Sequence, residues 1–149
     1  MQKKLRIFAA ISTVISLTFA LNLQPSVADN PQPRKIYSGW LPYYSMKTSL
    51  PAALNNIDLM KEVMPFWYTF KYNGTKASIT DLYTPANPSV PINQPLATMR
   101  SAGLTIIPTI TDGTDKLVLA NLLSTDSGRS AAVQVITDLV MQNNFDGID

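Results

Sequence analysis

Residues 62–70 read EVMPFWYTF, a run that is almost continuously apolar after its first residue. Such a run is typical of a strand that is buried on both faces, as strands are in parallel sheets. Lys71-Tyr72-Asn73-Gly74 follows the run directly and is a turn signal. The stretch therefore predicts one buried strand of a parallel sheet.

Strand-like and helix-like segments alternate on both sides of this run. Ser49 is predicted to cap a short helix that has Pro51 in its first turn, and Gly103 is predicted to end a later helix as a left-handed cap. An apolar stripe at three- and four-residue spacing predicts a long helix that ends near residues 143–144, and its members are Ala132, Val133, Ile136, Leu139 and Val140. The predicted strands are 36–44, 62–70, 104–110 and the opening of a fourth at 145–149, and the predicted helices include 52–60, 93–102 and 116–123. Residues 71–91 are predicted to be irregular or a small hairpin, and the βαβαβαβ order indicates an α/β fold with a parallel sheet.

The N-terminus is typical of a cleaved secretory signal peptide. A cationic start is followed by the apolar run 7–23, and small residues at Ser26 and Ala28 precede a cut before Asp29. An uncleaved membrane anchor is the alternative, but the run is on the short side for spanning a bilayer. We therefore expect residues 1–28 to be a signal, 29–35 to be a Pro-rich linker and 36–149 to be the folded domain of a secreted, extracellular or cell-wall-associated protein.

Composition excludes several kinds of chemistry. The chain has no Cys and no His, so it has no thiolate nucleophile, and it lacks the commonest general base and the commonest metal ligand. Loss of the signal removes three of the 12 basic residues, and the remaining nine stand against 10 acidic residues for a net charge of −1. A net charge of −1 does not indicate the basic surface that nucleic-acid binding requires. No phosphate-binding glycine motif follows any strand, and we expect no cofactor, no metal and no membrane contact after cleavage.

Aromatic and acidic residues gather where the predicted strands end. Ligands of such folds bind at the carboxyl ends of the strands, and these ends carry Tyr43, Tyr44, Trp67, Tyr68 and Asp112. Flat aromatic faces suit the CH-rich faces of sugar rings, and carboxylates suit their hydroxyls, so these residues are predicted to bind substrate. The alternative for an aromatic residue on an apolar strand is a place in the core.

The segment FDGID at 145–149 resembles the first half of the DxxDxDxE motif of family 18 glycoside hydrolases, the chitinase-type (β/α)8 barrels. YSGWLPYYS resembles the first strand of that family. VMPFWYTFKYNGT and MRSAGLTIIPTITDG resemble the second and third units of its branch of spore-germination-type peptidoglycan hydrolases. The resemblance covers residues 36–149 and implies the N-terminal half of a TIM barrel, with strands one to three and the start of strand four. An SxGG-like segment common in chitinases is replaced here by residues 108–113.

The resemblance also implies roles for the two terminal carboxylates. Asp149 matches the innermost carboxylate of a stacked row and Asp146 a structural hydrogen-bonding residue. The family's third Asp and its acid Glu would lie two and four positions beyond Asp149. The only Glu in the chain is Glu62, at the wrong end of its strand, so we expect these residues to be inactive alone. The implied chemistry is substrate-assisted hydrolysis of β-1,4-linked N-acetylglucosamine in chitin or peptidoglycan.

Two other interpretations stay open. A non-catalytic relative would bind the same polysaccharides without cutting them. A complete small α/β domain with an unrelated role would leave a long apolar strand edge without a neighbour, which is an aggregation hazard. For that reason we expect residues 29–149 expressed alone to be insoluble or loosely packed.

Overall fold

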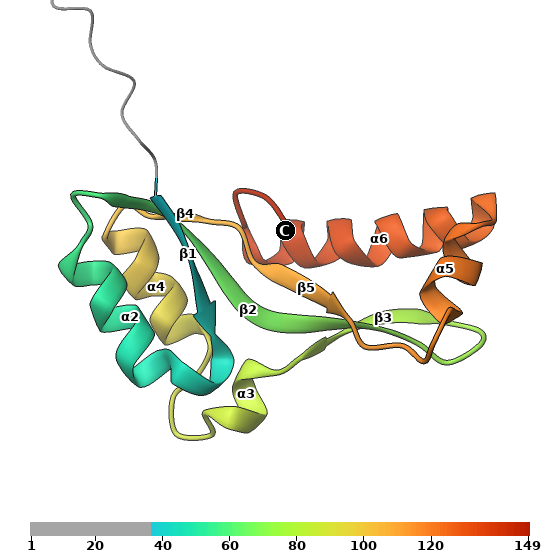
Figure 1. The fold of residues 1–149 in the computed structure, drawn as a ribbon, viewed down its shortest axis with the longest axis horizontal. Coiled ribbons are helices and arrows are strands. Elements are labelled where there is room, and N and C mark those ends of the chain that lie inside the picture. Colours follow the sequence, from blue (N-terminus) through green and yellow to red (C-terminus); the bar gives the residue numbers. More distant parts are fainter. Residues whose placement is uncertain (1–36) are drawn as a thin grey trace, which may run out of the picture. The chain divides into compact units, whose positions relative to one another are not determined.

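The computed structural model describes residues 37–149, and Figure 1 shows their helices and strands. The predicted signal peptide and linker lie outside the described residues, as does Ile36 at the start of the predicted domain. The elements in chain order are β1 Tyr37–Pro42, η1 Tyr43–Ser45, α2 Met46–Asn55, β2 Met60–Tyr72, β3 Ala77–Asp81, α3 Tyr83–Ala86, α4 Asn93–Ser101, β4 Thr105–Ile106, β5 Thr109–Asp112, α5 Val118–Leu123 and α6 Asp126–Asn143. In this part of the chain no helix is both long enough and apolar enough to cross a bilayer.

Strand β2 is the centre of a mixed sheet, with parallel neighbours along both of its edges (Figure 1). Phe66 pairs with Pro42 of β1 and also with Thr109 of β5, so β1 and β5 lie on opposite edges of β2. The apolar strand therefore has a neighbour on each edge, and the reason for expecting an insoluble or loosely packed chain is wrong. Strand β3 is antiparallel to β2. It pairs with the same edge of β2 as β1 does, but farther along the strand, where Tyr68 pairs with Asp81. The predicted α/β fold with a parallel sheet is confirmed, and the predicted small hairpin is β2–β3.

The β2–β5 register shifts once, between Phe66 and Tyr68. Phe66 pairs with Thr109 and Tyr68 with Ile110, so residues two apart on β2 face neighbouring residues on β5. This is the pattern of a β-bulge at Trp67, which leaves one extra residue without a partner and changes the alternation of faces. Residues 62–66 alternate between buried and half-buried, whereas residues 67–70 are all buried.

The core lies between the sheet and its helices. Leu41, Val63 and Ile106 come from three neighbouring strands and are 2%, 0% and 1% exposed. One buried cluster joins them to Met99 of α4 and Met46 of α2, and Leu139 and Val140 of α6 pack against the same cluster. The three helices therefore cover the face of the sheet that carries these three strand residues.

Residues 145–149 begin a further parallel ladder on the free edge of β4 and β5. The Asp146 amide donates to the Ile106 carbonyl at 3.0 Å. The Asp149 amide donates to the Pro108 carbonyl at 3.0 Å, and the Asp149 carbonyl accepts from the Ile110 amide at 2.9 Å. In a parallel ladder, the amide and the carbonyl of one residue bond to the two residues that flank its partner. Asp149 bonds in this way to Pro108 and Ile110, so it lies opposite Thr109. This agrees with the predicted opening of a strand.

Helix α2 differs from its prediction. It begins at Met46, so Ser49 is inside its first turn and donates from Oγ to the Ser45 carbonyl at 3.0 Å instead of capping a helix. The turn η1 runs directly into the helix, which is therefore established before Pro51 is reached. Proline then removes a single donor, and the helix continues to Asn55.

The third predicted strand is divided. Residues 107–108 separate β4 from β5, because Pro108 has no amide hydrogen to donate, and β5 then continues to Asp112. Asp112 is thus the last residue of β5, two residues beyond the predicted end of this strand. The predicted cap at Gly103 is confirmed by its φ of 72°, and the long helix ends at left-handed Asn144, as expected.

The predicted apolar stripe of α6 is wrong at one position. Val133 is 62% exposed, whereas Ala132 is 4% exposed and packs with Phe70 and Ala77. Val135 takes a half-buried place against the same small cluster. A helix that buries Ala132 turns Val133 toward solvent, since consecutive residues are about 100° apart around the axis.

Candidate functional site

Asp149 occupies a defined place in a row of residues across four strands. Pro42, Phe66, Thr109 and Asp149 lie opposite one another in register, and residues paired in this way point to the same face. The carboxylate Oδ2 of Asp149 accepts a hydrogen bond from the Thr109 hydroxyl at 2.7 Å. The carboxylate is exposed, so its second oxygen is available to a ligand.

Asp146 ties the start of the same segment to β4. Its Oδ2 accepts from the Ile106 amide at 2.8 Å, while its own amide donates to the Ile106 carbonyl at 3.0 Å. Ile106 is buried, so its amide hydrogen depends on this carboxylate as its acceptor. This placement gives Asp146 a positioning function for residues 145–149.

We call the face of the sheet that carries Trp40, Phe66, Thr109 and Asp149 the open face. Trp40 is 66% exposed, and its ring stacks on Phe66 with centroids 6.5 Å apart. Tyr43 is half-buried and lies 6.0 Å from Phe66 and 5.2 Å from Tyr44, which is 71% exposed. Tyr43 and Tyr44 therefore lie near Phe66 just beyond the end of β1, and Tyr43 also packs against the buried cluster on the covered face.

Trp40 and Thr109 were not among the residues predicted to form the site. Trp40 is next to Leu41 in a strand, and the burial of Leu41 turns Trp40 to the other face. That alternation was present in the sequence and could have identified Trp40. The role of Thr109 depends on the pairing of two segments 40 residues apart, which no local pattern reveals.

Trp67 and Tyr68 lie in the core and not at an exposed rim. Trp67 is 0% exposed, with its ring 4.6 Å from that of Tyr83, and Tyr68 is 4% exposed and 6.1 Å from Phe145. The bulge at Trp67 explains why two consecutive strand residues are both buried. Burial, with a smaller contribution from Asp81, raises the pKa of Tyr68. Contact of these two residues with a sugar stays a prediction, and in this structure both serve packing.

Asp112 ends β5 on the other face from Thr109. Its Oδ1 accepts from the Thr114 hydroxyl at 2.7 Å and from the Thr114 amide at 2.8 Å. These bonds, and to a smaller degree the nearby Lys71, lower the pKa of Asp112. The carboxylate therefore fixes the loop after β5.

A cavity of about 250 Å³ adjoins both Asp112 and Asp149. It opens between the end of β5 and the helices α5 and α6. Apart from the two carboxylates and Thr111, the lining is apolar: Phe70, Ile110, Leu119, Leu123, Ala132, Ile136 and Ile148. The two acids thus border one hollow although they belong to different faces.

Glu62 does not approach this group. It pairs with Ser38 and Thr105, four residue pairs below the row that holds Asp149. Four residues along a strand correspond to about 13 Å. Within residues 37–149, no three carboxylate, His or Cys side chains gather closely enough to hold a metal ion.

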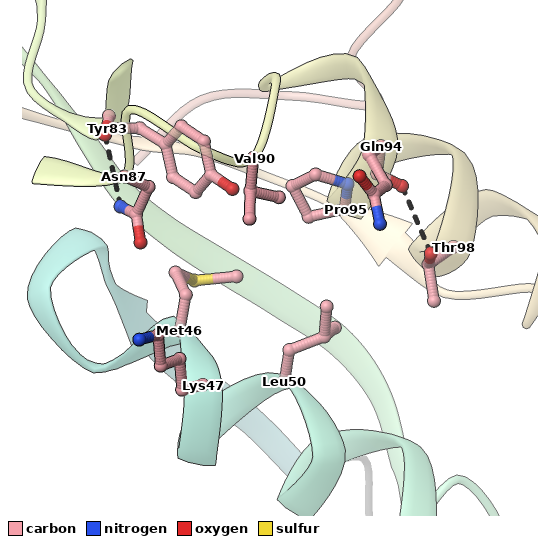
Figure 2. Close-up of a pocket in the computed structure, with 9 residues that line it drawn as sticks. All are labelled: Met46, Lys47, Leu50, Tyr83, Asn87, Val90, Gln94, Pro95 and Thr98. Atoms are coloured by element: carbon pink, nitrogen blue, oxygen red, sulfur yellow. Dashed lines mark hydrogen bonds between the residues drawn. The ribbon is translucent and has the colours of Figure 1, made fainter. Parts of the chain in front are cut away.

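A second cavity lies between α2, α3 and α4, as Figure 2 shows. Its volume is about 140 Å³, and Lys47 is the only charged residue that lines it. Asn87 holds its wall together, because its Nδ2 donates to the Tyr43 carbonyl at 2.8 Å and to the Tyr83 carbonyl at 3.0 Å. The cavity thus belongs to the packing of the α3 turn against the helices and contains neither motif carboxylate.

Comparisons with known proteins identify the fold. No family model matches the chain, and no curated protein matches it. A crystal structure of a chitinase from Chromobacterium violaceum ATCC 12472 is similar, with a TM-score of 0.50 and 16% identity. The match covers 74% of this chain and 33% of that chain, so the chain spans about a third of the chitinase. The likeness shows a chitinase-like fold, a mixed α/β chain with a parallel sheet.

Proposed function

We propose that the chain supplies the first strands of a secreted, family 18-type glycoside hydrolase barrel that acts on β-1,4-linked N-acetylglucosamine polymers. The observation that carries the proposal is the exposed carboxylate of Asp149 on the same face as the Trp40–Phe66 aromatic pair. In a (β/α)8 barrel this face is the interior, and helices cover the other face, as α2, α4 and α6 do here. The structural likeness to a chitinase agrees with this arrangement.

The row around Asp149 suits the chemistry that we propose. Aromatic rings offer flat apolar surfaces to pyranose rings, and a carboxylate binds or orients polar groups beside them. The Thr109 hydroxyl uses one oxygen of Asp149 and leaves the other for a neighbouring acid or a substrate. In the proposed barrel the positions two and four beyond Asp149 would share its face, because alternate strand residues point the same way.

Residues 1–149 alone are proposed to bind polysaccharide without cutting it. The only Glu is Glu62, about 13 Å below Asp149 along the strands, and that is too far for it to act together with Asp149. The same observation favours a second candidate, a non-catalytic carbohydrate-binding barrel. The two candidates differ in whether an acid stands four positions beyond Asp149.

The test uses the product of the full coding sequence and residues 1–149 side by side on chitin and on peptidoglycan. The hydrolase proposal expects the full product to release reducing sugars and Asp149→Asn to slow release by about 10²-fold or more. Residues 1–149 are expected to bind polysaccharide and release nothing. Binding by both proteins without release by either selects the non-catalytic candidate. The absence of both binding and release contradicts the proposal.

A further inference from the structure

A groove of about 640 Å³ lies between the β2–β3 turn and the α5 region. We call it the hairpin groove. It is lined by Tyr72, Asn73, Gly74, Asp115, Val118, Asn121, Leu122 and Thr125. None of these residues lines the cavity beside Asp149, so the hairpin groove is a separate feature of the surface.

The hairpin wall of the groove is held in a fixed shape. The Tyr72 hydroxyl donates to the Gly74 carbonyl at 2.8 Å, which fixes the ring against its own turn. Asn73 Oδ1 accepts from the Thr75 amide at 3.1 Å and from the Lys76 amide at 2.8 Å. Gly74 has a φ of 94°, a conformation that glycine adopts without strain. An aromatic ring that is already ordered loses little entropy when a ligand covers it.

The helix wall presents polar groups that are not used within residues 37–149. Asp115 and Asn121 are exposed, and neither side chain makes a hydrogen bond to another described residue. Val118 and Leu122 line the same wall and are half-buried apolar residues. The wall therefore combines apolar surface with a carboxylate and an amide.

The backbone that enters this wall is strained. Leu117 has a φ of 64° and is 63% exposed. A leucine in the left-handed region costs about 1 kcal/mol or more, and such residues are concentrated at functional sites. Because the Leu117 side chain is exposed, it makes few packing contacts that could offset the energetic cost of this conformation. The strained residue directly precedes Val118, which lines the groove.

We infer that the hairpin groove is a second carbohydrate-binding site, which takes a segment of a neutral N-acetylated polysaccharide apart from the row around Asp149. The Tyr72 ring and the apolar side chains of Val118 and Leu122 suit the CH faces of pyranose rings, and Asp115 and Asn121 suit their hydroxyl and acetamido groups. The volume is within the range of small-molecule sites. The choice of ligand rests on the proposed function, whereas the shape and chemistry of the groove do not.

The test is amide hydrogen exchange of residues 1–149, read by mass spectrometry, with a soluble β-1,4-linked N-acetylglucosamine hexamer as the probe. Protection is expected in segments 72–76 and 115–122. Asn121→Ala and Asp115→Asn are each expected to weaken this protection, with an apparent affinity about fivefold lower. Gln142→Ala and Asp58→Asn change exposed residues outside the groove and are the matched controls, which should bind as the unchanged chain does.

The two proposals fail in different segments. Protection of 37–44 and 145–149 without protection of 72–76 and 115–122 overturns the second site and leaves the proposed function standing. Protection of the groove segments that is undiminished in both groove variants also overturns it, since the named side chains would then not be the ligands. Protection of the groove segments alone supports the second site and contradicts ligand binding on the open face.

Discussion

Asp149 lies opposite Thr109 in a parallel ladder, and its carboxylate accepts a hydrogen bond from the Thr109 hydroxyl at 2.7 Å. The backbone bonds to Pro108 and Ile110 fix the register, and the side-chain bond fixes the carboxylate on the face of Phe66 and Trp40. A carboxylate held in this way has a defined direction before any ligand arrives.

Replacement of Thr109 by Val should remove the side-chain bond to Asp149 while keeping the β-branched shape that suits a strand. We expect Thr109→Val to lower the free energy of unfolding by about 0.5 to 1 kcal/mol, because the bond is partly exposed. Thr105→Val is the matched control, since the Thr105 hydroxyl makes no hydrogen bond within residues 37–149. Urea unfolding at neutral pH measures both, and equal losses would argue against the Thr109–Asp149 bond.

Asp146 should be more important for stability than its exposure suggests. Asp146→Ala removes the acceptor of the buried Ile106 amide and should cost about 1 to 3 kcal/mol. Asp146→Asn keeps a side-chain oxygen and should retain most of that stability. Urea unfolding of the pair tests the positioning role, and a loss in the Asn variant as large as in the Ala variant would contradict it.

The two tryptophans should respond in opposite ways to truncation. Trp67 is fully buried against Tyr83, so Trp67→Ala should cost about 3 to 5 kcal/mol or prevent folding. Trp40→Ala removes an exposed ring and should change stability by less than about 1 kcal/mol while weakening sugar binding. Thermal melts and oligosaccharide titrations separate the two effects. A large loss of stability in Trp40→Ala would assign Trp40 to packing.

The α/β order, the buried strand and the ends of two helices could be predicted from the sequence because they depend on local patterns. Gly103 was predicted as a left-handed cap, and the long helix was predicted to end near residues 143–144. The bulge at Trp67 could not, since it arises only when β2 pairs with β5, and it decides whether Trp67 and Tyr68 are exposed. The early start of α2 likewise depends on the turn before it, which made Pro51 a poor marker of the helix start.

Gly147 in the motif segment and Gly113 directly after Asp112 should differ in their tolerance of a side chain. A Cβ at Gly147 would lie 3.6 Å from the Ile107 side chain, which is ordinary contact, so Gly147→Ala should be neutral or stabilise by up to about 1 kcal/mol. A Cβ at Gly113 would overlap the hydroxyl oxygen of buried Thr69, so Gly113→Ala should cost about 1 to 3 kcal/mol. Chemical denaturation of both variants checks the contrast, and the reverse order of stability would contradict the packing around β5.

Stability should fall in strong base because of Tyr68. Its pKa is raised above the ordinary value of 10.0 mainly by burial, so above pH 10 the unfolded state loses this proton while the folded state keeps it. Each such proton lowers the free energy of unfolding by about 1.4 kcal/mol per pH unit. Urea unfolding between about pH 9 and 11 should show a shallower decline in Tyr68→Phe than in the unchanged chain or in Tyr44→Phe. Identical declines in all three proteins would remove Tyr68 as the cause.

Tryptophan emission during titration with a soluble β-1,4-linked N-acetylglucosamine hexamer tests sugar binding on the open face most directly. The chain has two tryptophans, of which Trp40 is 66% exposed on that face and Trp67 is 0% exposed. We predict a saturable blue shift and protection of Trp40 from acrylamide quenching, with both effects lost in Trp40→Phe and the buried Trp67 signal unchanged. An emission spectrum that the hexamer leaves unaltered, or a shift that persists in Trp40→Phe, would contradict the account.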